Sequence, residues 1–255
     1  MDVLLKFGRV LFAIAMVFFG VQFVIFAATL TGPVPGPPWT RGSAVVAWLV
    51  AAGFFAAGLS LATGMMARWA SLLVGAALVG FGLIHYGPAL VAKPHDPGPW
   101  TVLFELLALG GGALVIAASF PPPPPGRWVY RLADAGRILI AISLVVFAVQ
   151  HFIYAGFVAT LVPAWIPERL FWAYFTGTAF VAAALSFVAE KMGWLAGFLL
   201  GTMFLIWVLV LHIPRVAAAM RNGDEVTSLF VALAMSGIGF ALGALHRRDG
   251  SYLQR

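Results

Sequence analysis

Six polar side chains lie within long apolar stretches of the sequence, where a group that binds a ligand or moves a proton is energetically costly. They are Gln22, His85, Glu105, Gln150, His151 and His212. Glutamine and histidine can donate hydrogen bonds to carbonyl groups, and histidine and glutamate can exchange protons. Such a set suits a quinone headgroup, whose carbonyls accept hydrogen bonds and whose ring stacks on aromatic side chains. From these residue types alone we predict no catalytic residue and no metal site.

The overall composition indicates a membrane protein. Of the 255 residues, 15 are Lys or Arg and 9 are Asp or Glu, so 9% are charged, while 62% are hydrophobic. Soluble domains carry about 25% charged residues, so this composition excludes an ordinary cytosolic enzyme, a nucleic-acid-binding domain and a disordered chain. The absence of cysteine excludes disulfides, thiolate metal sites and cysteine nucleophiles.

The charges divide the chain into eight apolar windows, each able to supply the roughly 20 residues that a membrane-spanning helix needs. The expected spans lie near residues 9–29, 43–63, 69–91, 101–120, 137–159, 170–189, 193–213 and 226–246. Because backbone groups in lipid must be satisfied within the span, we expect an all-α polytopic fold whose principal partner is the lipid bilayer.

The distribution of basic residues predicts the orientation. Ten Lys and Arg residues fall in segments on the side of the N-terminus, and five fall on the other side. The positive-inside rule then places both termini in the cytoplasm and the protein in the inner (plasma) membrane. The net charge of +6 fits this asymmetry, and no nucleic-acid partner is needed to explain it.

The chain also contains an internal repeat. Residues 8–27 and 136–155 are identical at 11 of 20 positions, including a Gly-Arg pair and a glutamine. Later pairs, such as Thr101 with Thr227 and His85 with His212, follow at offsets of 126 and 127. We therefore expect two parallel four-helix bundles, one in residues 1–120 and one in 137–255. A proline-rich, basic cytoplasmic linker, residues 121–136, would join them.

This repeat resembles the unit of the DoxX family of bacterial integral membrane proteins. The resemblance is carried by Gly8-Arg9 and Gly136-Arg137, each opening a long apolar helix, by the small residues of 53–64, and by Leu211 to Arg215 followed by Glu225. It covers nearly the whole chain and implies four-helix units and a redox-associated role. The family includes membrane subunits of a thiosulfate:quinone oxidoreductase, so quinone and a soluble oxidoreductase are the implied partners. It supplies no catalytic residues for this chain.

The six polar residues are all expected in the outer half of the membrane, where they could converge on one cavity. Glu105 and His151 have apolar counterparts in the other repeat, Val231 and Phe23, so these two are the better functional candidates. Structural roles remain open as well. The glutamines could hydrogen-bond between helices, and His85 and His212 could simply stabilise helix C-termini. A haem or metal held between these two histidines is a further, less favoured alternative.

Three functions therefore stay open. The first is a redox-associated membrane subunit that binds quinone or anchors an oxidoreductase. The second is a small-solute transporter, for which we expect no ionisable residue in the inner half of the membrane to line a pathway. The third is a non-catalytic structural or assembly partner.

Overall fold

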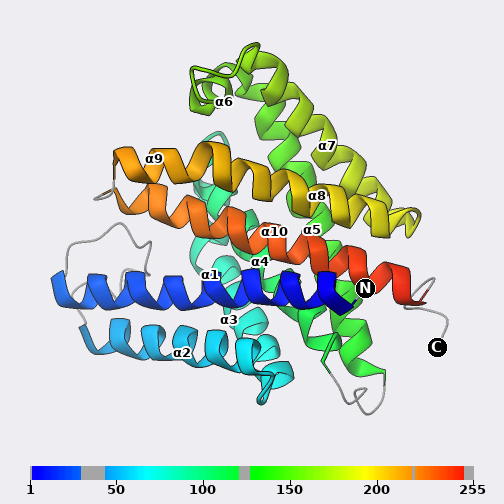
Figure 1. Ribbon diagram of the computed structural model, residues 1–255. Coiled ribbons are helices and arrows are strands. Elements are labelled where there is room, and N and C mark those ends of the chain that lie inside the picture. Colours follow the sequence, from blue (N-terminus) through cyan, green and yellow to red (C-terminus); the bar gives the residue numbers. More distant parts are fainter. Residues whose placement is uncertain (1, 30–43, 121–126, 220–221, 250–255) are drawn as a thin grey trace.

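The computed structural model describes residues 2–29, 44–120, 127–219 and 222–249, and the described part of the chain is helical apart from short turns (Figure 1). The helices are α1 (Asp2–Thr29), α2 (Ala44–Thr63), α3 (Ala67–Ala92), α4 (Pro97–Ala118), α5 (Trp128–Ile153), α6 (Ala155–Leu161), α7 (Arg169–Ala189), α8 (Gly193–Trp207), α9 (Ile213–Ala218) and α10 (Gly223–Asp249). A π-helical turn, η2 (Val208–His212), joins α8 to α9. Eight helical stretches are long and apolar enough to cross a membrane, which confirms the all-α, multi-pass architecture.

The helix boundaries differ from the sequence prediction in the middle of the chain. Helix α5 begins at Trp128, well before Arg137, so residues 128–136 belong to the helix and not to a linker. The proline segment 121–125 lies outside the described residues. Helix α5 ends at Ile153, and the short helix α6 follows a break at Tyr154, where a continuous span to residue 159 was expected.

The helices pack as a ring of neighbours. In Figure 1, α1, α2, α8 and α10 lie side by side, and α5 and α7 cross them at a steep angle. Helix α1 packs along α2 and α10, and α5 packs along α7 and α4. The first helix of each half of the chain therefore packs against the last helix of the other half, so the two halves share two long interfaces.

Close backbone contacts between glycines mark both of these interfaces. A Cβ atom added at Gly8 of α1 would lie 2.6 Å from the carbonyl oxygen of Gly237 of α10. In the same way, a Cβ atom added at Gly111 of α4 would lie 2.5 Å from the carbonyl oxygen of Gly136 of α5. Neither distance leaves room for a side chain. Small residues at such positions are what allow helices in lipid to approach closely.

A substitution at one of these contacts tests their importance. We expect Gly111→Ala to destabilise the protein by about 1–3 kcal/mol, because the added methyl group must displace backbone atoms. Gly53→Ala in α2 is the matched control, since a Cβ atom there meets nothing within 4 Å. That change should be neutral or stabilising by up to about 1 kcal/mol. Thermal unfolding midpoints in detergent compare the two, and equal midpoints would contradict the packing argument.

Candidate functional site

A cavity of about 290 Å³ lies within the second half of the bundle, between α4, α5, α7, α8 and α10. Four of the six predicted polar residues line it. They are Glu105, Gln150, His151 and His212. We call this space the polar cavity. These four residues come from both halves of the sequence and border the same space.

Aromatic side chains form much of the remaining wall of the polar cavity. They are Phe147, Trp172, Phe180, Phe204 and Trp207. His151 makes an edge-to-face contact with Phe180, with ring centroids 5.2 Å apart. A mainly apolar wall with a few hydrogen-bonding groups is typical of small-molecule sites. These rings could not be identified from the sequence, because aromatic residues in a span give the same pattern whether they face a cavity or lipid.

Glu105 and His151 provide hydrogen-bond acceptors in the polar cavity. The His151 Nδ1 atom lies 2.8 Å from the carbonyl oxygen of Phe147. Because a carbonyl only accepts, Nδ1 carries the proton in the neutral ring, and Nε2 remains as an acceptor. The Glu105 carboxylate has no hydrogen bond or ion pair to any residue that the structure describes. The two side chains are thus available to a ligand that carries hydroxyl groups.

His212 reaches the polar cavity from the end of the π-helical turn η2. Its Nδ1 atom is buried and has no hydrogen-bond partner among the described residues. Buried polar atoms without partners are rare in proteins and point to a missing ligand or water. Single π-helical turns inside long helices also occur frequently at functional sites.

The π-helical turn explains a change of offset within the repeat. Gly75 of α3 approaches Gly110 and Leu114, and Gly201 of α8 approaches their counterparts, Ser236 and Phe240, so the offset here is 126. His85 and His212 pair at an offset of 127. One extra residue therefore lies between these points in α8, and a π turn holds one more residue than an α turn. Helix α3 has no such turn between Ala67 and Ala92.

Gln22 and Gln150 make equivalent hydrogen bonds at the two interfaces between the halves. Gln150 Nε2 donates to Thr101 Oγ1 at 3.0 Å and to the carbonyl oxygen of Pro97 at 3.2 Å. Gln22 Nε2 donates to Thr227 Oγ1 at 2.8 Å and reaches the carbonyl oxygen of Gly223 at 3.4 Å. Both glutamines thus join helices, which was the structural alternative for them. Only Gln150 also lines the polar cavity.

Gln22 and His85 do not line the polar cavity, so the prediction that all six residues converge is wrong for these two. His85 stacks on Phe81, with centroids 5.4 Å apart, and contacts the edge of Tyr86. Gln22 and His85 lie on α1 and α3, and neither of these helices contributes a residue to the wall of the polar cavity. The polar cavity gives no support to a haem shared by His85 and His212, because only His212 lines it. In the described part of the chain, no group of three His, Asp or Glu residues could hold a metal ion.

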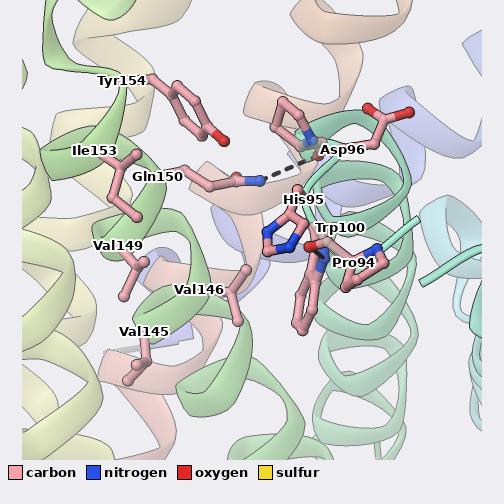
Figure 2. Close-up of a pocket in the computed structure, with 11 residues that line it drawn as sticks. Pro94, His95, Asp96, Trp100, Val145, Val146, Val149, Gln150, Ile153 and Tyr154 are labelled. Carbon is pink, nitrogen blue, oxygen red and sulfur yellow. Dashed lines mark hydrogen bonds between the residues drawn. The ribbon is translucent and has the colours of Figure 1, made fainter. Parts of the chain in front are cut away.

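A second and larger cavity of about 510 Å³ lies between the start of α4 and the end of α5 (Figure 2). Its wall includes Trp100 and the α5 residues Val145, Val149 and Ile153, and Figure 2 shows Gln150 reaching across it toward α4. We call this space the groove. Gln150 lines both the groove and the polar cavity.

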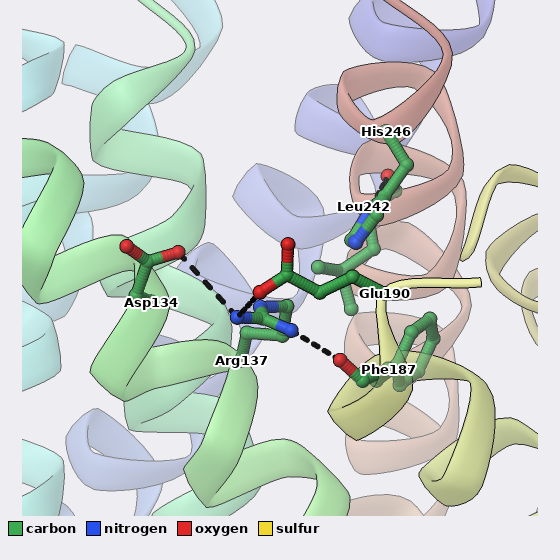
Figure 3. A network of polar contacts seen from close by, with 6 residues as sticks. All are labelled: Asp134, Arg137, Phe187, Glu190, Leu242 and His246. Atoms are coloured by element: carbon green, nitrogen blue, oxygen red, sulfur yellow. Dashed lines mark hydrogen bonds and ion pairs between the residues drawn. The ribbon is translucent and has the colours of Figure 1, made fainter. Parts of the chain in front are cut away.

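A cluster of charged residues lies at the opposite end of the same helices (Figure 3). Arg137 is only 6% exposed, and its guanidinium lies 2.7 Å from Glu190 and 3.7 Å from Asp134. It also donates a hydrogen bond to the carbonyl oxygen of Phe187. His246 is partly buried beside Phe187 and Gly193.

Arg137 thus lies inside α5, nine residues beyond its first residue, Trp128, and not at the start of a helix. Charge-free windows missed Arg137 because a charged residue can enter a helix when a partner neutralises it. The repeat-related Arg9 has a different environment. It donates to the hydroxyl and the carbonyl oxygen of Ser119 and lies 4.0 Å above the Phe120 ring. Among the residues that the structure describes, carboxylates lie beside Arg137 and not beside Arg9.

Comparisons of the chain with protein-family models, with curated proteins and with solved structures find no match. The chemistry of the cavities is therefore what bears on function.

The difference between the two arginines is testable. We expect Arg137→Met to destabilise the protein by about 1–3 kcal/mol, since it leaves two partly buried carboxylates and the Phe187 carbonyl oxygen without their charged donor. Arg9→Met is the matched control and should cost less, because Arg9 contacts neutral groups. Adding Glu190→Gln to Arg137→Met should recover part of the loss. Thermal unfolding midpoints in detergent measure all three, and the absence of any recovery would contradict the charge-pairing explanation.

Proposed function

We propose that the protein is a redox-associated membrane subunit that binds the headgroup of a quinone or quinol in the polar cavity. The observation that carries the proposal is the meeting of Glu105, His151 and His212 inside one aromatic-walled cavity within the bundle. The Glu105 carboxyl group and His151 Nε2 can accept hydrogen bonds from the two hydroxyl groups of a quinol. A soluble oxidoreductase bound to the membrane face would exchange the electrons.

The ring of such a ligand also fits the shape of the site. A cavity of about 290 Å³ lies at the lower limit for small-molecule sites, which suits a headgroup better than a large cofactor. Phe180 and Phe204 stack with centroids 5.7 Å apart and offer a flat apolar wall. The buried Nδ1 atom of His212 needs a partner, and a ligand oxygen or a bridging water would supply one.

We further propose that the chain is a duplicated, DoxX-like protein with two four-helix units. The matched contacts support this: Gly8 with Gly237 corresponds to Gly136 with Gly111, and the two Gln–Thr hydrogen bonds also correspond. Duplication leaves one copy free to specialise. Three features differ between the repeats. Where one repeat has Glu105, the other has Val231, and where one has His151, the other has Phe23. The π-helical turn η2 corresponds to a regular stretch of α3.

A small-solute transporter is the second candidate. It is favoured by the cluster of Asp134, Arg137 and Glu190, because ionisable groups now stand at both ends of α5. Between these ends, Ile140 and Leu144 are fully buried, and the interior is closed there. A carrier would have to open this layer. Solute flux into proteoliposomes that is abolished by Glu105→Gln would favour this second function.

Two substitutions test the quinone site while preserving the fold. Glu105→Val and His151→Phe install the residues that the other half carries at the equivalent positions. Each removes an acceptor for a quinol hydroxyl group, a hydrogen bond worth about 1.5–3 kcal/mol, so we expect quinol affinity to fall by about 10- to 100-fold. Quenching of tryptophan fluorescence can follow the titration, because Trp172 and Trp207 line the cavity.

Gln22→Leu and Gln150→Leu provide a matched pair for the same titration. Both remove an equivalent Gln–Thr hydrogen bond and should lower stability similarly, by about 1 kcal/mol. Only Gln150→Leu should also weaken quinone binding, because only Gln150 borders the cavity. If the unaltered protein shows no saturable quenching and its lipid extract contains no quinone, the proposed function is wrong and a purely structural role gains support.

The sidedness of the protein, with both termini in the cytoplasm of a cell with an inner membrane, is likewise our proposal. The chain has no cysteine, so a single introduced cysteine gives an unambiguous label. Lys93 and Lys191 are both exposed and lie in turns on opposite sides of the predicted membrane. An impermeant maleimide added to intact cells should label Lys93→Cys and spare Lys191→Cys. The reverse pattern would invert the topology.

A further inference from the structure

The groove and the polar cavity share one lining residue, Gln150. Gln150 extends from α5 to α4 and lines both spaces (Figure 2). Helices α4 and α5 meet backbone to backbone at Gly111 and Gly136, about 20 Å further along α5 at 1.5 Å per residue. At the level of Gln150, the side-chain bonds to Thr101 and Pro97 are what join the two helices.

The wall of the groove changes from polar to apolar along its length. His95, Asp96 and Tyr154 lie at one end, near the start of α4. Val145, Val149 and Ile153 follow at intervals of four residues along α5 and so form one stripe. These three side chains are 46%, 47% and 67% exposed in the isolated protein, as expected for a surface that faces hydrocarbon.

We propose that the groove holds the hydrocarbon tail of the same ligand whose ring occupies the polar cavity. The ligand is then a long-tailed quinone that enters from the lipid, and Gln150 lies where its ring joins its tail. This inference rests on the proposed function of the polar cavity. The larger space, about 510 Å³ against about 290 Å³, falls on the apolar side, where a tail longer than the ring would lie.

A phospholipid is a poorer occupant of the groove. Its phosphate would need a cationic or N–H-rich rim. The polar end of the groove instead carries the Asp96 carboxylate, which accepts the backbone N–H of Gly98 at 3.0 Å and caps α4. The Trp100 indole N–H is also occupied, because it donates to the carbonyl oxygen of Pro94 at 3.0 Å.

Two probes with the same ring test the inference. One is a benzoquinol with a decyl chain, and the other is the same benzoquinol without the chain. Each is titrated against the whole protein in nanodiscs made from one phospholipid, with concentrations expressed per lipid, so that partitioning into the bilayer does not count as binding. We expect both probes to bind and the decyl probe to bind at least about tenfold more tightly.

Val149→Trp blocks the groove without touching the polar cavity. It should reduce binding of the decyl probe by about tenfold and leave the chain-free probe unchanged. Val188→Trp in α7 is the control, because Val188 is 58% exposed and lines neither space. It should alter neither titration. A diazirine at the end of the decyl chain should label residues 145–154, and excess phospholipid should not compete.

The outcomes separate the two proposals. If both probes bind equally and Val149→Trp changes neither, the ring site stands and the tail site is overturned. The tail site is also overturned if Val149→Trp weakens both probes alike, or if phospholipid removes the diazirine label, since lipid would then be the occupant. If neither probe binds, the proposed function of the polar cavity is wrong and the tail site falls with it.

Discussion

The close approach of glycine backbones at two helix pairs is the contact on which the rest of this structure depends. In a bilayer, apolar helices gain little by exchanging lipid for one another, so packing requires surfaces that fit closely. Gly8 against Gly237 and Gly111 against Gly136 provide that fit, and each joins the first helix of one half to the last helix of the other. Because both joints lie toward the same end of the bundle, the helices at the other end are held by side chains.

That difference between the two ends accounts for the position of the polar cavity. Far from the glycines, Gln22 and Gln150 bridge to threonines on the neighbouring helices. Where α4 and α5 are held this way, space remains on either side of Gln150, and both the polar cavity and the groove lie there. The same geometry in the first half is occupied by aromatic packing, such as Phe23 on Phe54 with centroids 5.9 Å apart.

The eight spans and four of the six candidate site residues could be predicted from the sequence, because hydrophobic length and isolated polar residues are local signals. The ion pair of Arg137 with Glu190 could not be predicted, because it joins positions 53 residues apart. In the sequence alone, the charge of Arg137 indicates the start of a helix. The π-helical turn had a detectable signal, the change of offset from 126 to 127 within α8. Only the structure shows that the added residue is accommodated next to His212.

The two halves differ in their ionisable residues, and at both ends of the bundle the additional ionisable groups lie around the second half. At one end Val231 and Phe23 stand where the cavity has Glu105 and His151, and at the other Phe120 stands where the charged cluster has His246. Each change adds an ionisable group around the second half of the bundle, and each such group in lipid costs several kcal/mol unless it finds a partner. Arg137 has found its partners among the carboxylates, whereas the carboxylate of Glu105 and the buried ring nitrogen of His212 have none among the described residues. Glu105 and His212 therefore carry a desolvation cost that no other residue in the described part of the chain offsets. A bound ligand can offset it by supplying the missing hydrogen bonds, which is what we expect of a ligand site.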